Sequence, residues 1–338
     1  MDGDPAARLV LTDEPYNVKI AGHVTGGAHR EFAMASGEMT DDEFLAFNAI
    51  WTAAVLPHLS DGGVFGTYID WRGWPIIFSA AAKLGLTPLN LVVWAKTNAG
   101  MGSLYRSAHE LLPLFKKGDA QHVNNIQLGK KGRWRSNVWT YPGASSRGSD
   151  ARHGLQDHPT VKPTAMLEDA LLDLTNRGDI VIDPFLGSGS TLIAAEKTRR
   201  VCRGVELDPL YVDVIVRRYQ AVTGKAAVLI ETNETFAALA VRRAPLTRPS
   251  SGPTSDLREE VIGLTTSVLF PANRGGDDMV PVSILDAVST VEDDKIAAGE
   301  RLDFQTRPAS TDVADEPDLN SDQSALGGEA DPRNARRR

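Results

Sequence analysis

Short apolar segments alternate with amphipathic ones through the first 240 residues, and this alternation strongly limits the folds open to the chain. Strands are expected at Arg8–Thr12, Gly63–Ile69, Leu89–Ala95, Ile180–Ile182, Cys202–Leu207 and Ala226–Glu231. Helices are expected after the capping box Thr40–Glu43, around Leu167–Leu174, and over Ser190–Lys197 and Leu210–Val222. Strands that alternate with helices predict an α/β layered sheet with mostly parallel strands. Ligands bind such sheets at the carboxyl ends of the strands.

The last part of the chain has a different composition. From about Pro245 onward Pro, Ser, Asp and Gly dominate, and Phe270 and Phe304 are the only aromatic residues. Val261–Phe270 and Val280–Val288 are the candidates for short local elements. Such a segment buries too little apolar surface to offset chain entropy. We therefore predict a folded domain over residues 5–240 and an acidic, largely disordered tail over residues 245–338.

The net charge of −8 hides a segregation of charge. Residues 251–338 carry a net charge of −9, and residues 1–250 carry +1. Arg106–Arg152 contains nine basic residues against three acidic ones. This basic stretch lies within Ser103–Pro159, which shows little periodicity and is interpreted as an irregular insert over residues 103–157. The segregation places any contact with nucleic acid in the middle of the chain.

Composition also excludes several classes of protein. The one cysteine, Cys202, cannot form an internal disulfide or a cysteine-based zinc site, and no metal site is predicted. The longest apolar stretches, such as Leu89–Ala95, are far shorter than the roughly 18 residues of a membrane helix. The acidic start Met1–Asp4 lacks the order of a signal peptide. We expect a cytoplasmic protein without a membrane partner.

The sharpest motif is Asp183–Thr191 (DPFLGSGST), which follows an expected strand and opens an expected helix. Its glycines allow a tight turn and a close approach of the backbone to a ligand, and the helix N-terminus favours an anionic group. The motif lacks the Gly-Lys-Ser/Thr ending of a phosphate-binding P-loop. A second expected strand ends near Glu206, where an acid is placed to accept hydrogen bonds from ribose hydroxyls.

Two weaker motifs accompany the first. Asp13–Asn17 (DEPYN) follows the first expected strand, and an acid with an aromatic residue there can hold a planar ring that bears an amino group. His158–Pro163 (HPTVKP) lies just before an expected helix. Each of the two, taken alone, is also compatible with an ordinary loop or helix start.

In this order the three motifs resemble those of the β-class amino DNA methyltransferases. The likeness covers about residues 8–240 and includes Tyr68–Asp70, Val93–Lys96 and His109–Gly118. Asn17-Val18 and His29–Met34 are similar to methylases that carry an N-terminal ParB-like domain; that domain is expected to be absent, because the chain begins a dozen residues before Asp13.

The resemblance implies a Rossmann-like methyltransferase sheet of seven strands, S-adenosylmethionine as methyl donor and double-stranded DNA as partner. It implies cofactor binding by Asp183, Phe185, Gly187 and Gly189, with Glu206 on the ribose and Lys162 and Pro163 near the methionine part. It implies handling of a flipped target base by Asp13, Glu14, Pro15 and Tyr16. The insert would be the target-recognition region, with DNA contacts from Lys130, Lys131, Arg133, Arg135 and Asn137.

One position departs from the family motif, which has proline where this chain has Glu14. The backbone carbonyl, an expected acceptor for the target amine, is retained. The lost ring costs about 0.4–1 kcal/mol of preorganisation. The added carboxylate is expected near the path of the DNA phosphates. Activity is therefore expected to be reduced and not abolished.

The predicted function is site-specific methylation of the exocyclic N6 of a flipped adenine in DNA, in a bacterial or phage nucleoid. Asp at the first position of the amine motif favours adenine over cytosine N4. Three alternatives stay open: a cytosine-N4 enzyme, a catalytically weak or silent DNA-binding relative, and a methyltransferase for RNA or a small molecule. The sequence also leaves open a homodimer, a restriction endonuclease partner and the recognition sequence.

Overall fold

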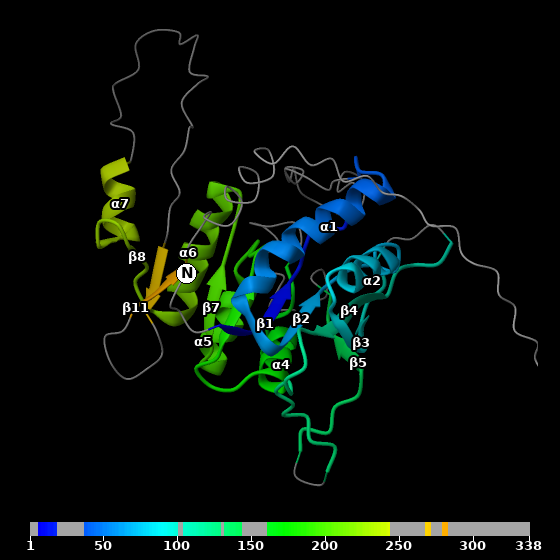
Figure 1. Cartoon of the computed structure of the whole chain (residues 1–338). Helices are drawn as coiled ribbons and strands as arrows, with labels where there is room; N and C mark the ends of the chain where they lie inside the picture. The colour runs from blue at the N-terminus through cyan, green and yellow to red at the C-terminus, as the bar shows by residue number, and fades with distance from the viewer. Residues whose placement is uncertain are drawn as a thin grey trace, which may run out of the picture. The chain divides into compact units, whose positions relative to one another are not determined.

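A seven-stranded sheet forms the centre of the described chain (Figure 1). The computed structural model describes residues 6–18, 37–100, 104–129, 132–143, 161–243, 268–271 and 279–282. The strands are β1 (Ala7–Thr12), β2 (Leu59–Thr67), β3 (Thr87–Lys96), β4 (His109–Lys116), β5 (Val138–Tyr141), β6 (Ile180–Asp183) and β7 (Val201–Gly204). Their order is β5-β3-β4-β2-β1-β6-β7. All run in one direction except β4, which is antiparallel to both β2 and β3.

The central strand β1 is buried on both faces. Leu9 and Leu11 belong to one hydrophobic core and Val10 to the other, and all three side chains have an exposed fraction of 0%. A parallel strand covered on both faces is expected to be a continuous apolar run, which is what the sequence has here. The strand predicted at Arg8–Thr12 is therefore confirmed.

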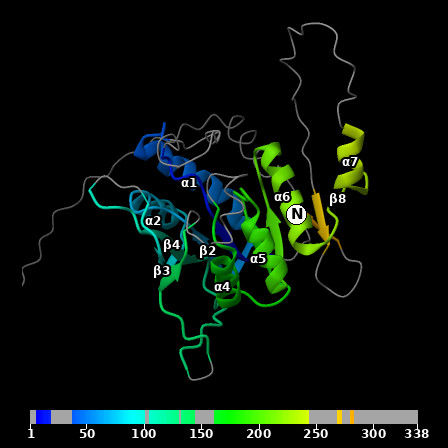
Figure 2. The ribbon, with the colours of Figure 1, turned by 180° about the vertical axis from the view of Figure 1, so that it is seen from behind.

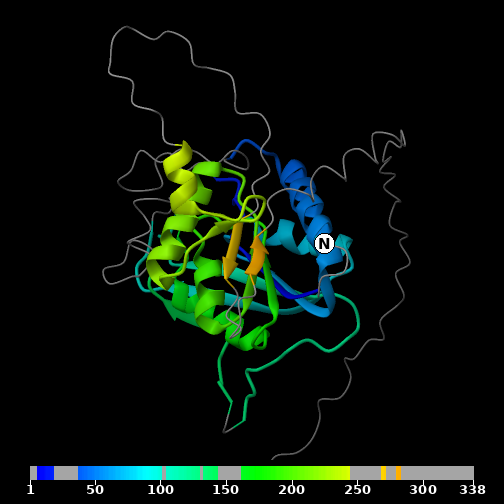
Figure 3. The same cartoon turned by 90° about the vertical axis from the view of Figure 1, so that its left-hand side faces the viewer.

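Helices cover the two faces of the sheet. Helices α1 (Asp41–Val55) and α2 (Trp74–Lys83) pack on one face, and α4 (Thr164–Leu174), α5 (Ser190–Thr198) and α6 (Pro209–Thr223) pack on the other. Figures 1 and 2 show these two layers from opposite sides, and Figure 3 shows them with the sheet between. The capping box predicted at Thr40 and Glu43 is present at the start of α1. None of the helices in the described ranges is long and apolar enough to cross a bilayer.

Two strands of the insert belong to the main sheet, so its interpretation as an irregular module was wrong for these parts. Strand β4 lies between β2 and β3, and β5 forms the edge beside β3. The run Leu111–Phe115 is apolar and buried, but Pro113 interrupts the usual appearance of a strand. Seven strands were predicted and seven are present, with β4 and β5 included and the strand expected at Ala226–Glu231 outside this sheet.

A second, smaller sheet has the order β11-β10-β8-β9. It contains β8 (Val228–Leu229), β9 (Glu234–Thr235), β10 (Val268–Pro271) and β11 (Met279–Val282), and α7 (Phe236–Arg243) follows β9. Strand β10 comes from the predicted tail, yet it pairs with β8 from the predicted folded domain. Apart from β10 and β11, the predicted disordered tail lies outside the described residues.

The order of the strands creates a switch point between β1 and β6. From β1 the chain passes through α1 (with the 3-10 turn Leu56–His58) to β2 on one side, and from β6 it passes through α5 to β7 on the other. The loops after β1 and β6 therefore diverge above neighbouring strands. A ligand crevice forms at such a point, outside the carboxyl ends of the strands.

The turn into α5 depends on Gly189, and we predict that Gly189→Ala destabilises the protein by about 2 kcal/mol. Gly189 has a φ of 76°, and a Cβ there would lie 2.9 Å from Cγ2 of Ile215 on α6. Gly224→Ala is the matched control, because Gly224 has a φ of 70° but no atom within 4 Å of its Cβ position. Urea unfolding should show a loss of about 1 kcal/mol for the control. Equal losses for both variants would contradict the packing argument.

Candidate active site

The loops after β1 and β6 lie side by side. Thr12 donates a hydrogen bond of 2.6 Å from its hydroxyl to Oδ1 of Asp183, although 171 positions separate the two residues in the chain. Val10 and Ile182 are paired in register on the neighbouring strands. The amine motif and the glycine-rich motif therefore share one edge of the sheet, as the sequence predicted.

Four charged side chains meet beside the amine motif. Nζ of Lys162 lies 2.5 Å from Oδ2 of Asp13 and 3.2 Å from Oε2 of Glu110. Lys96 forms an ion pair with the other oxygen of Glu110. The hydroxyl of Tyr16 donates to Glu110 at 3.0 Å. Two carboxylates and two ammonium groups are therefore balanced within a largely buried site.

Aromatic rings enclose the same lysine. Nζ of Lys162 lies 5.4 Å from the ring centroids of Tyr16 and Tyr68 and 5.9 Å from that of Trp94. These three rings are called the aromatic cluster below. The hydroxyl of Tyr68 is buried and has no hydrogen-bond partner among the described residues. The site thus combines flat apolar walls with a carboxylate acceptor and one unused donor.

The charges fix the ionisation of this cluster. Burial by itself would raise the pKa of Glu110, but Lys162 and Lys96 outweigh it and lower that pKa to about 2. Burial would lower the pKa of Lys162, and Asp13 and Glu110 reverse this and raise it. Burial raises the pKa of Asp13, while Lys162 opposes the rise. Glu110 therefore stays a carboxylate and Lys162 stays an ammonium group.

The glycine-rich loop is organised by two acids. Asp183 accepts from Thr12 and, at 3.2 Å, from the backbone N–H of Phe185. Glu206 follows β7 by two residues and accepts from the N–H of Gly187 at 2.8 Å and of Asp208 at 3.0 Å. Burial is the main cause that raises the pKa of each acid to about 6. The strand expected to reach Glu206 ends earlier, at Gly204.

The glycine-rich loop is also held by Arg218, an arginine that was not identified from the sequence. Nη1 of Arg218 on α6 donates to the carbonyl of Ser188 at 2.8 Å and to Oγ of Ser190 at 2.9 Å. These bonds support the turn between β6 and α5 from a neighbouring helix. A charge-assisted hydrogen bond to a backbone carbonyl is stronger than a neutral one, so the loop shape is preset.

Glu14 does not point toward a DNA path, so that expectation was wrong. Its side chain is 2% exposed, and its Oε2 accepts a hydrogen bond of 2.9 Å from Nε1 of Trp51 on α1. The reason is alternation at the end of β1: Asp13 contacts Lys162 in the charged site, and Glu14 turns to the core under α1. Pro15 and Tyr16 follow as half-buried residues.

The predicted DNA-contacting residues that the structure describes, Arg133, Arg135 and Asn137, do not lie at this edge. Because β4 is antiparallel, the chain leaves Lys116 beside Thr87 at the start of β3, at the opposite edge from Asp13. The N–H of Lys117 donates to the carbonyl of Gly63, and the N–H of Asn125 donates to the carbonyl of Asp173 near the end of α4. Lys130 and Lys131, like residues 144–160, lie outside the described residues.

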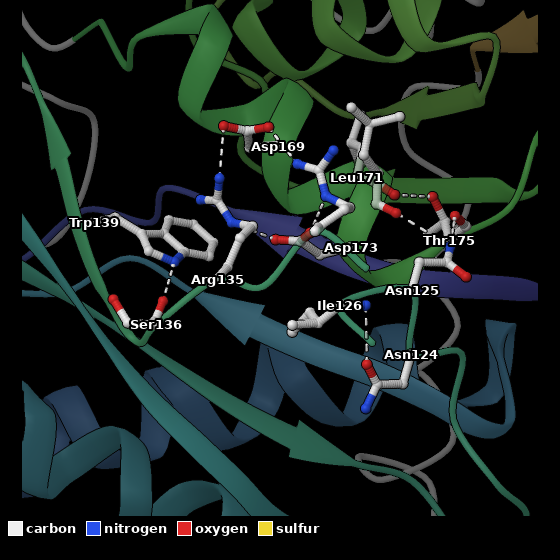
Figure 4. A network of polar contacts seen from close by, with 12 residues as sticks. Asn124, Asn125, Ile126, Arg135, Ser136, Trp139, Asp169, Leu171, Asp173 and Thr175 are labelled. Atoms are coloured by element: carbon white, nitrogen blue, oxygen red, sulfur yellow. Dashed lines mark hydrogen bonds and ion pairs between the residues drawn. The ribbon is translucent and has the colours of Figure 1, made fainter. Parts of the chain in front are cut away.

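The two arginines of this segment are bound to α4, as Figure 4 shows for Arg135. Arg135 forms ion pairs of 2.8 Å with both Asp169 and Asp173, and Arg133 also pairs with both carboxylates. Arg135 additionally lies 4.7 Å over the ring of Trp139. The Nδ2 of Asn137 donates to the carbonyl of Leu91 at 3.1 Å. These side chains fasten the segment to the domain in this structure.

Glu110, Lys96 and Tyr68 are site residues that sequence reasoning did not assign. Each lies in a stretch that resembles the family, yet none stands out by local spacing. Glu110 reaches the site because β4 pairs with β3, where Trp94 is its register partner. The sequence does contain a signal for Glu110, because this acid stands at the start of an apolar run that has the pattern of a buried strand. The signal can be used only when β4 is recognised as a strand.

Comparison with known proteins decides the family. The family model of the DNA methylases that act on N6 or N4 amino groups matches residues 7–217, which is more than half of the chain. The protein belongs to this DNA methylase family. The match includes β1 through most of α6 and thus the site residues described above except Arg218, which lies just beyond its end. The family resemblance expected from the sequence is confirmed, and the choice between N6 and N4 is left open by this finding.

Individual relatives of this methylase are distant. The type II methyltransferase M2.DpnII of Streptococcus pneumoniae is 25% identical over 225 residues, which cover 63% of this chain and 82% of the relative. M.HpaI of Haemophilus parainfluenzae, also a type II methyltransferase, is 23% identical, with 62% and 67% covered. Among solved structures, an M1.HpyAVI complex with SAM is 22% identical, with 63% and 89% covered and a TM-score of 0.45.

The raised pKa of Asp183 predicts a pH dependence of stability. Because the folded methylase holds this proton up to about pH 6, whereas the ordinary value is 3.8, the unfolded chain releases it first as pH rises. The free energy of unfolding should therefore fall by about 2 kcal/mol between pH 4.5 and 7 through this group. Between pH 4.5 and 7 the free energy of unfolding, measured by urea titration, should fall by about that much more for the wild type than for Asp183→Asn, while Glu206 titrates in both proteins. Parallel slopes would contradict the assignment.

Proposed function

We propose that this methylase transfers the methyl group of S-adenosylmethionine to the exocyclic N6 of an adenine flipped out of double-stranded DNA. One observation carries the proposal: the carboxylate of Asp13 lies among the aromatic cluster, next to the Asp183 loop. A base needs a flat apolar site and a polar acceptor for its amino group. The family supplies the reaction class, and the acid at the first position of the amine motif favours adenine.

The Asp183 loop fits S-adenosylmethionine, which carries the reactive methyl group on a sulfonium centre. The carboxylate of Glu206 is bound by backbone N–H groups and by no cation among the described residues, so it can accept from ribose hydroxyls. The half-buried ring of Phe185 offers an apolar contact for a second planar group. Gly187 and Gly189, both at positive φ, let the backbone come close to a ligand.

The residues around Asp13 would prepare the target amine for attack. The carboxylate of Asp13 and the backbone carbonyl of Glu14 accept hydrogen bonds from the two amine protons, which leaves the nitrogen lone pair free. When bound, S-adenosylmethionine would supply the methyl group to this nitrogen, and its sulfur would keep the electron pair of the carbon–sulfur bond that breaks. The methylated amine then loses one proton, for which Asp13 is the nearest acceptor. Alignment of the two reactants supplies much of the rate.

Before the base binds, the ammonium group of Lys162 lies where this proposal places the target amine. Its ammonium group is a nitrogen donor at 2.5 Å from Asp13, inside the aromatic cluster, and it also contacts Glu110. Glu110 can hold Lys162 after the base has taken Asp13, because Glu110 is a stable carboxylate. The proposal thus places Lys162 at the target amine, whereas the sequence placed it near the methionine part of the cofactor.

The loops after β2 and β3 are proposed to face the DNA, because both leave the same edge as Asp13. Trp71 is 60% exposed and Arg72 follows it, while Tyr105 is 84% exposed beside Arg106. The Arg106 guanidinium bonds to the carbonyls of Ala99 and Gly100, so those contacts leave its charge uncompensated. Cations and exposed aromatic rings at one edge are suited to phosphates and unstacked bases. A homodimer, an endonuclease partner and a place in the bacterial cytoplasm remain proposals beside this one.

Asp13→Asn is predicted to lower methyl transfer by about a hundredfold or more, because the amide replaces the charged acceptor. Binding of S-adenosylmethionine, measured by calorimetry, should change little, since Glu206 and the Asp183 loop are intact. The assay is transfer of labelled methyl groups to duplex DNA, followed by nucleoside analysis that separates N6-methyladenine from N4-methylcytosine. N4-methylcytosine as the product would reject adenine and favour the cytosine enzyme; cofactor binding without transfer by the wild type would favour a silent relative.

Arg106→Ala is predicted to weaken DNA binding and to reduce the slope of log affinity against log salt by about one. Lys130→Ala with Lys131→Ala is the control, because the sequence favoured these two lysines of the insert for DNA contact. If the double variant lowers the slope and Arg106→Ala leaves it unchanged, the part of the insert around Lys130 is the DNA-contacting segment and the proposed face is wrong.

A further inference from the structure

Glu14 links the amine motif to the cofactor loop through one tryptophan. Nε1 of Trp51 donates to Oε2 of Glu14 and to Oδ1 of Asn48, both at 2.9 Å. The Trp51 ring meets the edge of Phe185 with centroids 5.3 Å apart and planes at 86°. Its other contact is a stack on Phe65 at 5.4 Å. The loop after β1 and the loop after β6 are therefore both in contact with one indole ring.

The Glu14 carboxyl is unusual for a buried acid. Its Oε1 is buried and has no hydrogen-bond partner in the described part of the chain. The groups that face it are Trp51 and Asn48 of α1, Thr67 of β2 and, on its own loop, Asp13. None of these groups is a cation, and Asp13 is an acid itself. Burial is the main cause that raises the pKa of Glu14 well above its ordinary value.

We propose that Glu14 is a positioning residue for cofactor binding: its carboxyl holds the Trp51 indole, and the indole holds Phe185 where it contacts the bound cofactor. This inference rests on the proposed function, in which Phe185 contacts S-adenosylmethionine. In this proposal Glu14 has a role of its own and is more than a replacement of the family's proline that weakens the amine motif. The backbone carbonyl of Glu14 remains free to serve the target amine.

The uncharged form of the carboxyl is the one that fits this place. A carboxylate without a cation is strongly disfavoured in the core, whereas a carboxylic acid keeps its carbonyl acceptor for the indole N–H. Ionisation would leave a buried charge beside the Trp51 indole and loosen its packing. Binding of the cofactor should therefore weaken as pH rises through the raised pKa of Glu14.

The test compares two side chains of similar size at position 14 in the full chain. Glu14→Gln keeps an acceptor for the indole and cannot ionise, whereas Glu14→Met keeps the volume and removes the acceptor. For S-adenosylmethionine we expect Glu14→Met to raise the Kd and KM about five- to tenfold, with a much smaller effect on kcat. Glu14→Gln should recover most of that loss and remove the rise of KM with pH that is expected for the wild type.

Trp51→Phe provides the second arm, because it removes the donor of the same hydrogen bond together with part of the ring that meets Phe185. Its effect on the Kd should not add to that of Glu14→Met, since both remove one hydrogen bond. Equal Kd values for the wild type, Glu14→Met and Glu14→Gln would overturn the inference, as would a loss confined to kcat. If the wild type itself fails to bind S-adenosylmethionine, it is the proposed function that fails.

Discussion

The pairing of β1 with β6 is the constraint on which the site depends. It places Thr12 against Asp183 at 2.6 Å and thereby joins two loops whose sequences lie 171 residues apart. Each loop alone has little chemistry: one has an acid near aromatic rings and the other has a glycine-rich turn. Side by side at the switch point of the sheet, they offer neighbouring places for a base and for a methyl donor.

Charge balance then decides which groups in this small volume are ionised. Asp13 and Glu110 face Lys162 and Lys96, so burial is compensated pair by pair and the polar groups are fixed in direction before a substrate arrives. Glu14 is the neighbour of Asp13 but lies on the other side of the strand end, without a cation. Two adjacent acids thus have different surroundings: Asp13 contacts a lysine, which opposes the rise of its pKa on burial, whereas Glu14 contacts an indole.

Much of this arrangement could be predicted from the sequence, because its signals are local. The strand, turn and helix around Asp183–Thr191 are encoded by an apolar run, glycines and a following helical pattern. The capping box at Thr40 and the strand before Asp13 are equally local. The place of Glu110 was not predictable in this way, because it follows from the pairing of β4 with β3.

The basic insert shows what could not be predicted from local sequence. Its basic composition was predicted correctly, but the direction of β4 decides at which edge of the sheet the chain continues after this strand. Strand direction is not encoded in a local pattern. Asp169, which is partly exposed, and the buried Asp173 bind its arginines and lie in a helix about 35 residues later, so this charge neutralisation could not be predicted from local sequence.

Helix α4 connects the charged site to the arginine-bearing part of the insert. Pro163 immediately precedes it and Lys162 precedes Pro163, while the carboxylates farther along the same helix bind Arg133 and Arg135. A helix of this length is a stiff rod of roughly 16 Å. The ammonium group among the aromatic rings and the segment that carries the two arginines are therefore attached to the same rigid helix. A displacement of one end of this helix is transmitted to the other end.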